Sequence, residues 1–396
     1  MNYMKNKRVT RKKEKHIKIL YIIPSKTPTG PHIAILNMAI GISKNLKMKI
    51  FIITPKSFEL NYKNYYEKLR ESASIYEVSF KKQGILYWLS LAIKAFKLAL
   101  SKHIDIIHTA SLKILIPLGV ICKLIPAKLI LSLEGNPLYE MFEFSLFNRM
   151  IIILNWVIGM RLVDLILPCS KWLKSEMAQY PFLQDKLSFL HNPIDFERFQ
   201  NAKPRGIRQE IGVPEKAPMI LTVGRLHPVK DIETFLKAAE KTVKHHKNAW
   251  FVIVGDGPLR KNLENITKQL KISKHVVFTG FRHDVERFMA AADIYVMTSV
   301  YEPFGLVVAE AMAAGKPVIV TNVGGMPEIV GDAGLTVDAR DVDALAEAML
   351  KLLKDEELRR KLGEKARERI EKSFSAESVG ERLVQIYGSL LKDERQ

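Results

Sequence analysis

Short apolar runs alternate with longer amphipathic stretches along the first half of the chain. Ile17 to Ile23 is the first run, a turn-rich loop follows from Pro24 to His32, and Ile33 to Lys44 has helical spacing. Apolar runs of this length are typical of strands buried on both faces of a parallel sheet. The pattern repeats, which predicts a doubly wound α/β domain. Its further strands are expected at Ile50–Thr54, Ile104–His108, Leu129–Leu133 and Leu165–Pro168.

A second set of apolar runs begins at Met219 and predicts a second domain of the same class. The polar stretch from Asn201 to Glu215, with Pro204, Gly206 and Pro214, is the expected joint. Asp231–Val243 and Val342–Leu353 have helical patterns. With 396 residues the chain is also too long for one ordinary core. The second set of strands is expected at Met219–Val223, Trp250–Val254, Val276–Phe278, Ile294–Thr298 and Val318–Thr321.

The net charge of +19 is concentrated in the N-terminal half. Its densest part is the tail between Lys5 and Lys18, where Glu14 is the single acidic residue. A basic tail of this kind binds polyanions, and anionic lipid headgroups or nucleic acid both fit. A solvated arm without a partner is the alternative. Because charge is the sole argument for nucleic acid, we expect a membrane surface rather than nucleic acid as the partner.

Neither a secretory signal nor a membrane-spanning segment is visible in the sequence. Lysines or an arginine interrupt the longest apolar runs, whereas a spanning helix needs about 20 apolar residues. The amphipathic stretch Leu86–Leu98 has two interpretations: it lies in a membrane interface, or it covers a sheet. The two cysteines, Cys122 and Cys169, form no disulfide framework, so a reducing cytoplasm is the expected compartment, with peripheral attachment to the membrane left open.

The stretch from Val300 to Val320 carries the most specific chemistry. It follows a predicted strand, and its order of Pro303, Gly305 and a helix-forming run predicts strand, loop and helix. Amides from Phe304 to Leu306 at that helix N-terminus suit a phosphate. Glu302 and Glu310 are eight positions apart and suit hydroxyl groups on either side of it. A nucleoside diphosphate sugar has this form, although two such glutamates also occur at an ordinary helix start.

Two further strand ends bear on the same ligand. The strand ending at Val223 leads into Gly224 and Arg225, with Lys230 close behind, and two cations at this edge of a parallel sheet suit a diphosphate. The loop at Gly255 is rich in glycine, but Arg260 stands where a dinucleotide fingerprint has a third small residue. The sequence therefore argues against a dehydrogenase.

Taken together, these motifs resemble those of the group-one, family-four retaining glycosyltransferases of the GT-B fold. The resemblance extends over nearly the whole chain and is strongest between residues 224 and 328. It rests on Gly224-Arg-Leu with Lys230, Val254-Gly-Asp-Gly-Pro258, Phe278-Thr-Gly-Phe281, Glu302-Pro-Phe-Gly with Glu310, Ala314-Gly-Lys-Pro-Val318 and Gly324-Gly-Met-Pro-Glu328.

The resemblance implies two facing Rossmann-like domains with parallel sheets and a final helix that crosses back to the first domain. The boundaries are then a basic flexible tail at 1–16, an acceptor-side domain at 17–200, a nucleotide-sugar domain at 201–375 and the returning helix at 376–396.

It also implies residue roles. Arg225 and Lys230 would neutralise the diphosphate, Glu310 would bind the ribose, and Glu302 with the amides of Phe304, Gly305 and Leu306 would hold the transferred sugar and phosphate. Phe281 and Arg282 would lie near the base, and Gly224 and Gly255 would line the donor site. Such enzymes need neither a metal nor a cofactor, and His245-His246 and His283-Asp284 lack the remaining ligands of a metal site.

The N-terminal half departs from the family pattern at two places. The first loop has one glycine, Gly30, where paired glycines are usual, so Gly30 is the expected point of phosphate approach. Glu134 stands where many members have a histidine that bonds the transferred sugar. Our hypothesis is that Glu134 stabilises positive charge at the anomeric carbon or bonds a sugar hydroxyl, and a purely structural carboxylate is the alternative.

The expected function is transfer of a hexose from a nucleoside diphosphate sugar to a glycan or lipid-linked acceptor at the membrane surface, with retention of configuration. Glu134, Arg225, Lys230 and Glu302 are the expected catalytic residues. A non-catalytic nucleotide-sugar-binding protein and a GT-B epimerase are the alternatives.

Overall fold

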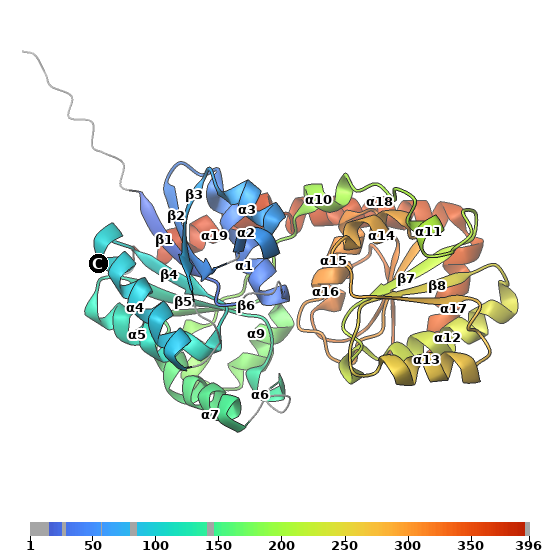
Figure 1. Ribbon diagram of the computed structural model, residues 1–396, viewed down its shortest axis with the longest axis horizontal. Helices are drawn as coiled ribbons and strands as arrows, with labels where there is room; N and C mark the ends of the chain where they lie inside the picture. The colour runs from blue at the N-terminus through green and yellow to red at the C-terminus, as the bar shows by residue number, and fades with distance from the viewer. Residues whose placement is uncertain (1–15, 26–28, 57, 80–84, 141–145, 393–396) are drawn as a thin grey trace, which may run out of the picture.

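The computed structural model describes residues 16–25, 29–56, 58–79, 85–140 and 146–392 of the chain. Two domains lie side by side, each built on one sheet with helices on both faces (Figure 1). Residues 1–15, which hold most of the predicted basic tail, lie outside the described residues.

The N-terminal sheet has six parallel strands in the order β3-β2-β1-β4-β5-β6. Its strands are β1 (Ile17–Ile22), β2 (Met48–Pro55), β3 (Ala73–Val78), β4 (Ile106–Thr109), β5 (Lys128–Leu133) and β6 (Leu165–Pro168). Its helices are α1 (Gly30–Ser43), α2 (Phe58–Asn61), α3 (Lys63–Leu69), α4 (Ile85–Lys102), α5 (Leu115–Leu124), α6 (Pro137–Glu140), α7 (Leu146–Leu154), which continues through a π-helical turn η3 (Asn155–Gly159) into α8 (Met160–Leu162), and α9 (Lys171–Ala178).

The C-terminal sheet repeats this topology, in the order β12-β11-β10-β7-β8-β9, with all strands parallel. Its strands are β7 (Met219–Val223), β8 (Trp250–Val254), β9 (Val276–Gly280), β10 (Ile294–Met297), β11 (Val318–Thr321) and β12 (Leu335–Val337). The remaining helices are α10 (Phe196–Gln200), α11 (Ile207–Glu210), α12 (Ile232–His245), α13 (Arg260–Gln269), α14 (Val285–Ala291), α15 (Leu306–Ala313), α16 (Met326–Val330), α17 (Val342–Lys354), α18 (Glu356–Ser373) and α19 (Ala376–Leu390).

The strand order of each sheet reverses direction once, between β1 and β4 and again between β7 and β10. Ligands of open parallel sheets bind outside the carboxyl ends of the strands at such a switch point. The predicted α/β architecture of two Rossmann-like domains is therefore confirmed, and it places one candidate site in each domain.

Two strands were absent from the sequence prediction, and both lie at sheet edges. β3 forms one edge of the N-terminal sheet and its apolar residues are interrupted by Ser74 and Glu77, and β12 at the edge of the C-terminal sheet is three residues long. An edge strand is covered on fewer sides, so it needs no continuous apolar run.

The two faces of the N-terminal sheet carry different helices. Leu20 and Ile22 of β1 belong to the core under α4, α5 and α8, whereas Ile19 and Tyr21 face α1, α3 and α19. In Figure 1, α4 and α5 lie on the side of this domain that is away from the C-terminal domain. The α4–α5–α7 layer therefore has one face on the sheet and one toward solvent.

Helix α19 crosses back from the C-terminal domain and packs on α1, as expected. The two helices touch at Gly41 and Gly380, because a Cβ at Gly41 would lie 2.0 Å from the Ala376 carbonyl oxygen. Below this crossing, the buried Tyr387 hydroxyl is hydrogen-bonded to Tyr21 (2.9 Å) and to His108 Nδ1 (2.6 Å). Burial lowers the pKa of His108 to about 3, so this histidine is neutral.

The chain crosses between the domains twice, and the two crossings are paired. The Ile194 amide donates to the Phe374 carbonyl oxygen (2.8 Å), and the Ala376 amide donates to the Ile194 carbonyl oxygen (3.0 Å). The links before α10 and before α19 therefore run side by side.

No helix in the described part of the chain combines the length and the apolar content that crossing a bilayer requires.

Candidate functional site

The carboxyl ends of β7, β8 and β9 form a row of closely spaced glycines. The Gly224 amide donates to the Val254 carbonyl oxygen, and the Gly255 amide donates to that of Gly280 (both 2.9 Å). Gly255 has φ +138°, and a Cβ there would lie 1.9 Å from the Gly224 carbonyl oxygen. Glycine is required here because the neighbouring backbone occupies the side-chain position. The row leaves backbone, rather than side chains, at the sheet edge.

The loops that follow β7 and β10, on either side of the switch point, are bound to each other. The Val300 amide donates to the Val229 carbonyl oxygen, and Thr298 Oγ1 donates to that of Lys230 (both 2.9 Å). Lys230 Nζ lies 2.5 Å from Glu302 Oε2, and both side chains are mostly buried. A cation and a carboxylate from different motifs therefore meet at the switch point. Arg225 is exposed in the same β7 loop.

Helix α15 starts directly behind this pair. Gly305 is its N-cap residue with φ +104°, and Leu306 is the first helical residue, so the amides of the first turn have no acceptor within the helix. The Phe304 ring does not face the cleft; it is buried against His191 and Phe374. The backbone of 304–306 therefore presents its N–H groups where a phosphate can bind.

Glu310 is the fifth residue of α15, about one turn from its start, and its carboxyl makes no hydrogen bond to a described residue. Burial raises the pKa of its carboxyl to about 7; Arg198 nearby lowers it, and Glu286 and Asp195 raise it. Its oxygens therefore retain their acceptor capacity, as the predicted ribose contact requires.

This shift predicts a pH dependence of donor binding. Hydroxyl groups donate to the ionised carboxylate, so affinity for a nucleoside diphosphate sugar should rise as the pH increases through about 7 and level off above it. Because the folded-state pKa lies above the ordinary value of 4.5, the same ionisation lowers the stability of the free protein between those two values. Calorimetric titration from about pH 5 to about pH 9 measures the profile.

The Glu310→Gln variant is the control for this profile, because glutamine keeps the shape and does not ionise. It should bind the donor weakly at every pH and show no inflection near neutrality. An unchanged inflection in this variant would assign the titration to another group.

The two residues expected near the base differ in whether other residues already hold their side chains. Phe281 follows β9, is 68% exposed and contacts the His283 ring edge-on. The Arg282 guanidinium is instead held by Asp284 (2.8 Å) and Glu210 (2.7 Å). A base contact by Arg282 would compete with these ion pairs, whereas Phe281 can stack without losing any.

On the opposite side of the cleft, Glu134 follows β5 and accepts a hydrogen bond from the Asn192 side-chain amide. Burial raises the pKa of the Cys169 thiol, and the charges of Glu134 and Glu302 raise it further. The negative charges of Glu134 in the N-terminal domain and of Glu302 in the C-terminal domain therefore both act on this one buried thiol.

Gly30 is the first residue of α1, at the switch point of the N-terminal sheet. It is exposed, and a Cβ there would meet no atom within 4 Å. The surrounding space is open, as the predicted approach of a phosphate would need.

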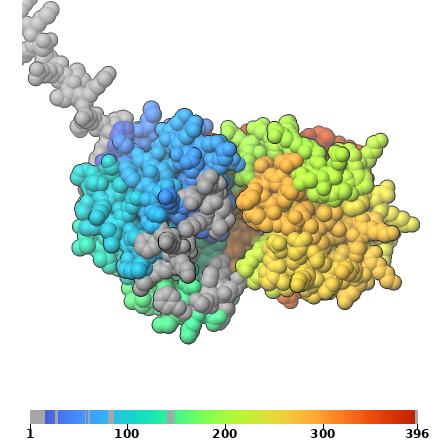
Figure 2. Space-filling model, in the orientation of Figure 1, coloured from blue at the N-terminus to red at the C-terminus, as the bar shows by residue number. Residues whose placement is uncertain are grey.

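Contacts from α16 and from the loop after β10 join the two domains at the boundary of the cleft. Glu328 of α16 accepts hydrogen bonds from the Lys171 (2.9 Å) and Trp172 (2.6 Å) amides at the start of α9 and from His191 (3.2 Å). Ser170 Oγ donates to the Pro303 carbonyl oxygen (2.7 Å). Burial opposes ionisation of Glu328, but these hydrogen bonds outweigh it, and its pKa lies below the ordinary value. Figure 2 shows the furrow between the two domains.

Sequence reasoning missed an aromatic group at this boundary. The Tyr301 hydroxyl accepts from the Asn136 amide (3.1 Å), and its ring lies 5.4 Å from Tyr139 and 5.6 Å from Trp172. The position of Tyr301 next to Glu302 was the signal that the sequence offered. The residues that Tyr301 contacts come from the other domain, so the sequence could not indicate them. Within the described ranges, no three His, Cys, Asp or Glu residues form a cluster that could hold a metal ion.

Two sequence models of known families match this chain in adjacent segments. The model described as "Glycosyltransferase Family 4" matches residues 30–198, and that described as "Glycosyl transferases group 1" matches residues 205–369. The chain belongs to the group 1, family 4 glycosyltransferases.

This family member is similar to named relatives, in one case along most of its length. It is 28% identical to N-acetyl-alpha-D-glucosaminyl L-malate synthase of Bacillus anthracis over 359 residues, which cover 87% of this chain and 90% of the relative. It is 30% identical to the UDP-Gal:alpha-D-GlcNAc-diphosphoundecaprenol alpha-1,3-galactosyltransferase of Escherichia coli over 180 residues, 44% of this chain and 46% of the relative.

A solved structure shares the fold. Anabaena Alr3699/HepE, determined in complex with UDP and glucose, superposes with a TM-score of 0.76 at 20% identity, covering 94% of this chain and 100% of that protein. The neighbours of this glycosyltransferase confirm the predicted GT-B fold.

Proposed function

We propose that this protein transfers a hexose from a nucleoside diphosphate sugar to a glycan or lipid-linked acceptor at the membrane surface, with retained anomeric configuration and without a metal or cofactor. The observation that carries the proposal is the contact between Lys230 and Glu302 at the switch point, directly before the N-terminus of α15. A diphosphate needs cations and amide donors, and the sugar attached to it needs an acceptor for its hydroxyls.

The donor half of the reaction follows from this arrangement. Lys230 and the exposed Arg225 supply positive charge to the leaving diphosphate, and the first-turn amides of α15 bind its oxygens. Glu302 binds the hydroxyls of the transferred sugar, Glu310 binds the ribose, and the Phe281 ring stacks on the base. The two cations and the α15 amides stabilise the negative charge that develops on the leaving group, so they supply what a divalent ion supplies elsewhere.

The acceptor half lies across the cleft. The Escherichia coli relative is named for an acceptor linked to diphosphoundecaprenol, which supports a lipid-linked acceptor here. We assign to Glu134, which follows β5 in the N-terminal domain, the role of stabilising positive charge at the anomeric carbon through its negative charge.

Glu134→Gln tests that role. Glutamine can still accept the hydrogen bond from Asn192, so the variant removes the charge and keeps the contact. We expect turnover to fall about 100-fold with little change in the KM for the donor, measured as release of nucleoside diphosphate. A fall of less than about tenfold with intact affinity would assign Glu134 a structural role.

The function is tested first by donor identity. Thermal-shift measurements with UDP-, GDP- and ADP-sugars should show one donor that stabilises the fold by mass action, and Arg225→Ala should reduce that shift. Product NMR then reports the anomeric configuration, and turnover with a chelator reports the need for metal. Absence of both a thermal shift and donor hydrolysis with every nucleotide sugar would refute the proposal.

A further inference from the structure

We infer that the solvent side of α4, α5 and α7 through α8 docks on an anionic lipid bilayer. We call this surface the helical face. The inference rests on the proposed function for its purpose, since it brings the protein to a lipid-linked acceptor, but it concerns a separate surface and a separate measurement.

The helical face is apolar where a soluble protein has polar residues. From residue 86 to residue 100, the exposed positions of α4 are four leucines or isoleucines and Lys97. From residue 146 to residue 161, the exposed positions among the residues whose exposure is described are six apolar residues and Arg161. The exposed apolar residues are Leu86, Leu89, Ile93 and Leu100 on α4, Val120 and Leu124 on α5, and Leu146, Met150, Ile153, Leu154, Val157 and Ile158 on α7 and η3.

The rest of the described surface shows that this is a local property. Elsewhere in the described residues, Leu46, Tyr139 and Phe281 are the only large apolar side chains with such exposure. Isolated exposed leucines are normal, but a contiguous apolar patch of this kind marks an interaction site. α5 contacts α4 on one side and, on the other, η3 and α8, which continue α7, so these elements form one layer.

The charges of the helical face select its partner. None of α4, α5, α7, η3 and α8 contains Asp or Glu, and each of these helices except η3 carries Lys or Arg. Lys97, Lys123 and Arg161 are exposed among the apolar side chains. A second copy of the chain would place these cations against identical cations, whereas anionic headgroups complement them. Basic residues among interfacial apolar side chains are the pattern of helices that lie on anionic bilayers.

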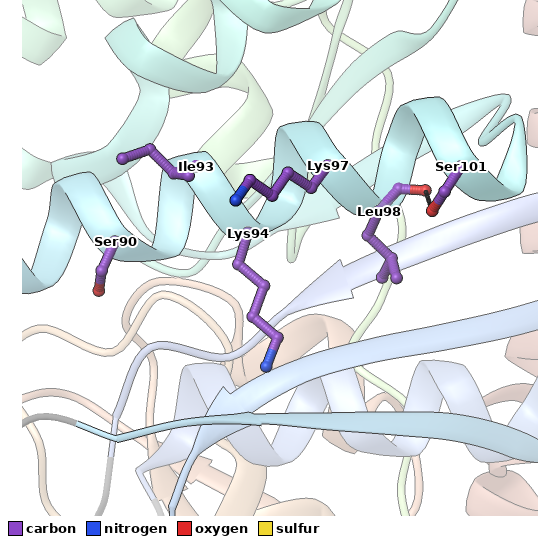
Figure 3. A pocket seen from close by; sticks show the side chains of 6 residues that line it. All are labelled: Ser90, Ile93, Lys94, Lys97, Leu98 and Ser101. Atoms are coloured by element: carbon purple, nitrogen blue, oxygen red, sulfur yellow. Dashed lines mark hydrogen bonds between the residues drawn. The ribbon is translucent and has the colours of Figure 1, made fainter.

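A groove on α4 is lined by both apolar and basic side chains. It has a volume of about 540 Å³ and is lined by Ile93 and Leu98 together with Lys94, Lys97, Ser90 and Ser101 (Figure 3). Lys94 reaches from it to the Glu77 carbonyl oxygen of β3 (2.5 Å), while Lys97 extends along the helix toward Ile93. An acyl chain beside Ile93 would place its phosphate next to Lys97.

The position of the helical face relative to the cleft agrees with the proposed acceptor. In a parallel sheet, crossover helices begin at the edge where the preceding strands end. The N-terminal ends of α4, α5 and α7, including Leu86 and Leu146, therefore lie at the carboxyl edge of the sheet, the same edge as Glu134. The face itself points away from the C-terminal domain, but the N-terminal ends of its helices would bring the bilayer nearest to the acceptor side of the cleft.

The test is flotation of the full-length protein with vesicles of phosphatidylcholine alone or mixed with phosphatidylglycerol. We expect binding to the mixed vesicles, and a loss of more than about tenfold in Ile93→Glu/Leu154→Glu, which places two carboxylates in the face. Lys97→Gln/Lys123→Gln should lose about tenfold on the mixed vesicles alone. The matched control is Leu46→Glu/Asn265→Glu, which adds the same charge at exposed positions elsewhere and should bind as the unchanged protein does.

Donor hydrolysis without vesicles is measured in parallel and should be unchanged in all these variants. No binding to mixed vesicles, or equal binding by the Ile93→Glu/Leu154→Glu variant, would overturn the inference while leaving the proposed function intact. Self-association that the same variant abolishes, without vesicle binding, would assign the face to a second copy. Vesicle binding without donor hydrolysis would instead refute the proposed function alone.

Discussion

Replacing Lys230 with alanine is expected to lower the rate of donor turnover about 1000-fold, because the departing diphosphate loses the cation at the switch point. The lysine ammonium lies 2.5 Å from Glu302 and directly before the N-terminus of α15, where the proposed phosphate site lies. Stopped-time assays of nucleoside diphosphate release at saturating donor measure the loss.

The control for this variant is Lys230→Arg, which retains the charge and should recover part of the activity. Because the alanine leaves the mostly buried Glu302 carboxylate without its cation, the unfolding midpoint is measured alongside. If Lys230→Ala retains more than about a tenth of the activity, Lys230 does not stabilise the leaving group.

Gly255→Ala is expected to destabilise the C-terminal domain by about 3 kcal/mol or more. The added Cβ would lie 1.9 Å from the Gly224 carbonyl oxygen, and φ +138° is a conformation that alanine rarely adopts. Chemical denaturation followed by circular dichroism measures the change.

Gly212→Ala is the matched control, since Gly212 has φ +74° but no atom within 4 Å of the added Cβ. It should cost about 1 kcal/mol, which is the strain of the backbone conformation alone. Equal losses in both variants would show that backbone strain, rather than the close approach of the β7 and β8 ends, requires glycine at 255.

The sequence predicted the buried strands well because a short, continuous apolar run is typical of a strand that is covered on both faces. Leu165–Pro168, Met219–Val223 and Trp250–Val254 coincide with β6, β7 and β8. β3 could not be recognised in this way, because polar residues interrupt its apolar run and its pairing with β2 becomes visible only in the folded sheet.

The residues of the candidate site were predictable where a sequence motif gives both the type of residue and its place at the end of a strand. Lys230 and Glu302 follow different strands, and the strand order brings them together as the switch-point rule requires. The ion pairs of Arg282 with Asp284 and Glu210, and the hydrogen bond from Asn192 to Glu134, were not predictable. These contacts depend on loops and helices whose relative positions no local pattern encodes.

Helix α4 shows why a single pattern allowed two interpretations. Tyr87, Leu91 and Ala95 cover the sheet, as one interpretation expected, while Leu89 and Ile93 remain outside. A helix that is apolar on both sides satisfies a core with one face and leaves the other for a partner.

The paired crossings at Ile194 and Phe374–Ala376 define how the two domains can move. Both covalent connections pass through one hydrogen-bonded point, whereas the contacts of Glu328 and Ser170 across the cleft are non-covalent. Breaking the contacts of Glu328 and Ser170 would let the two domains rotate apart about the paired segments. The paired segments therefore favour a rotation of the two domains about this point over a separation of the halves.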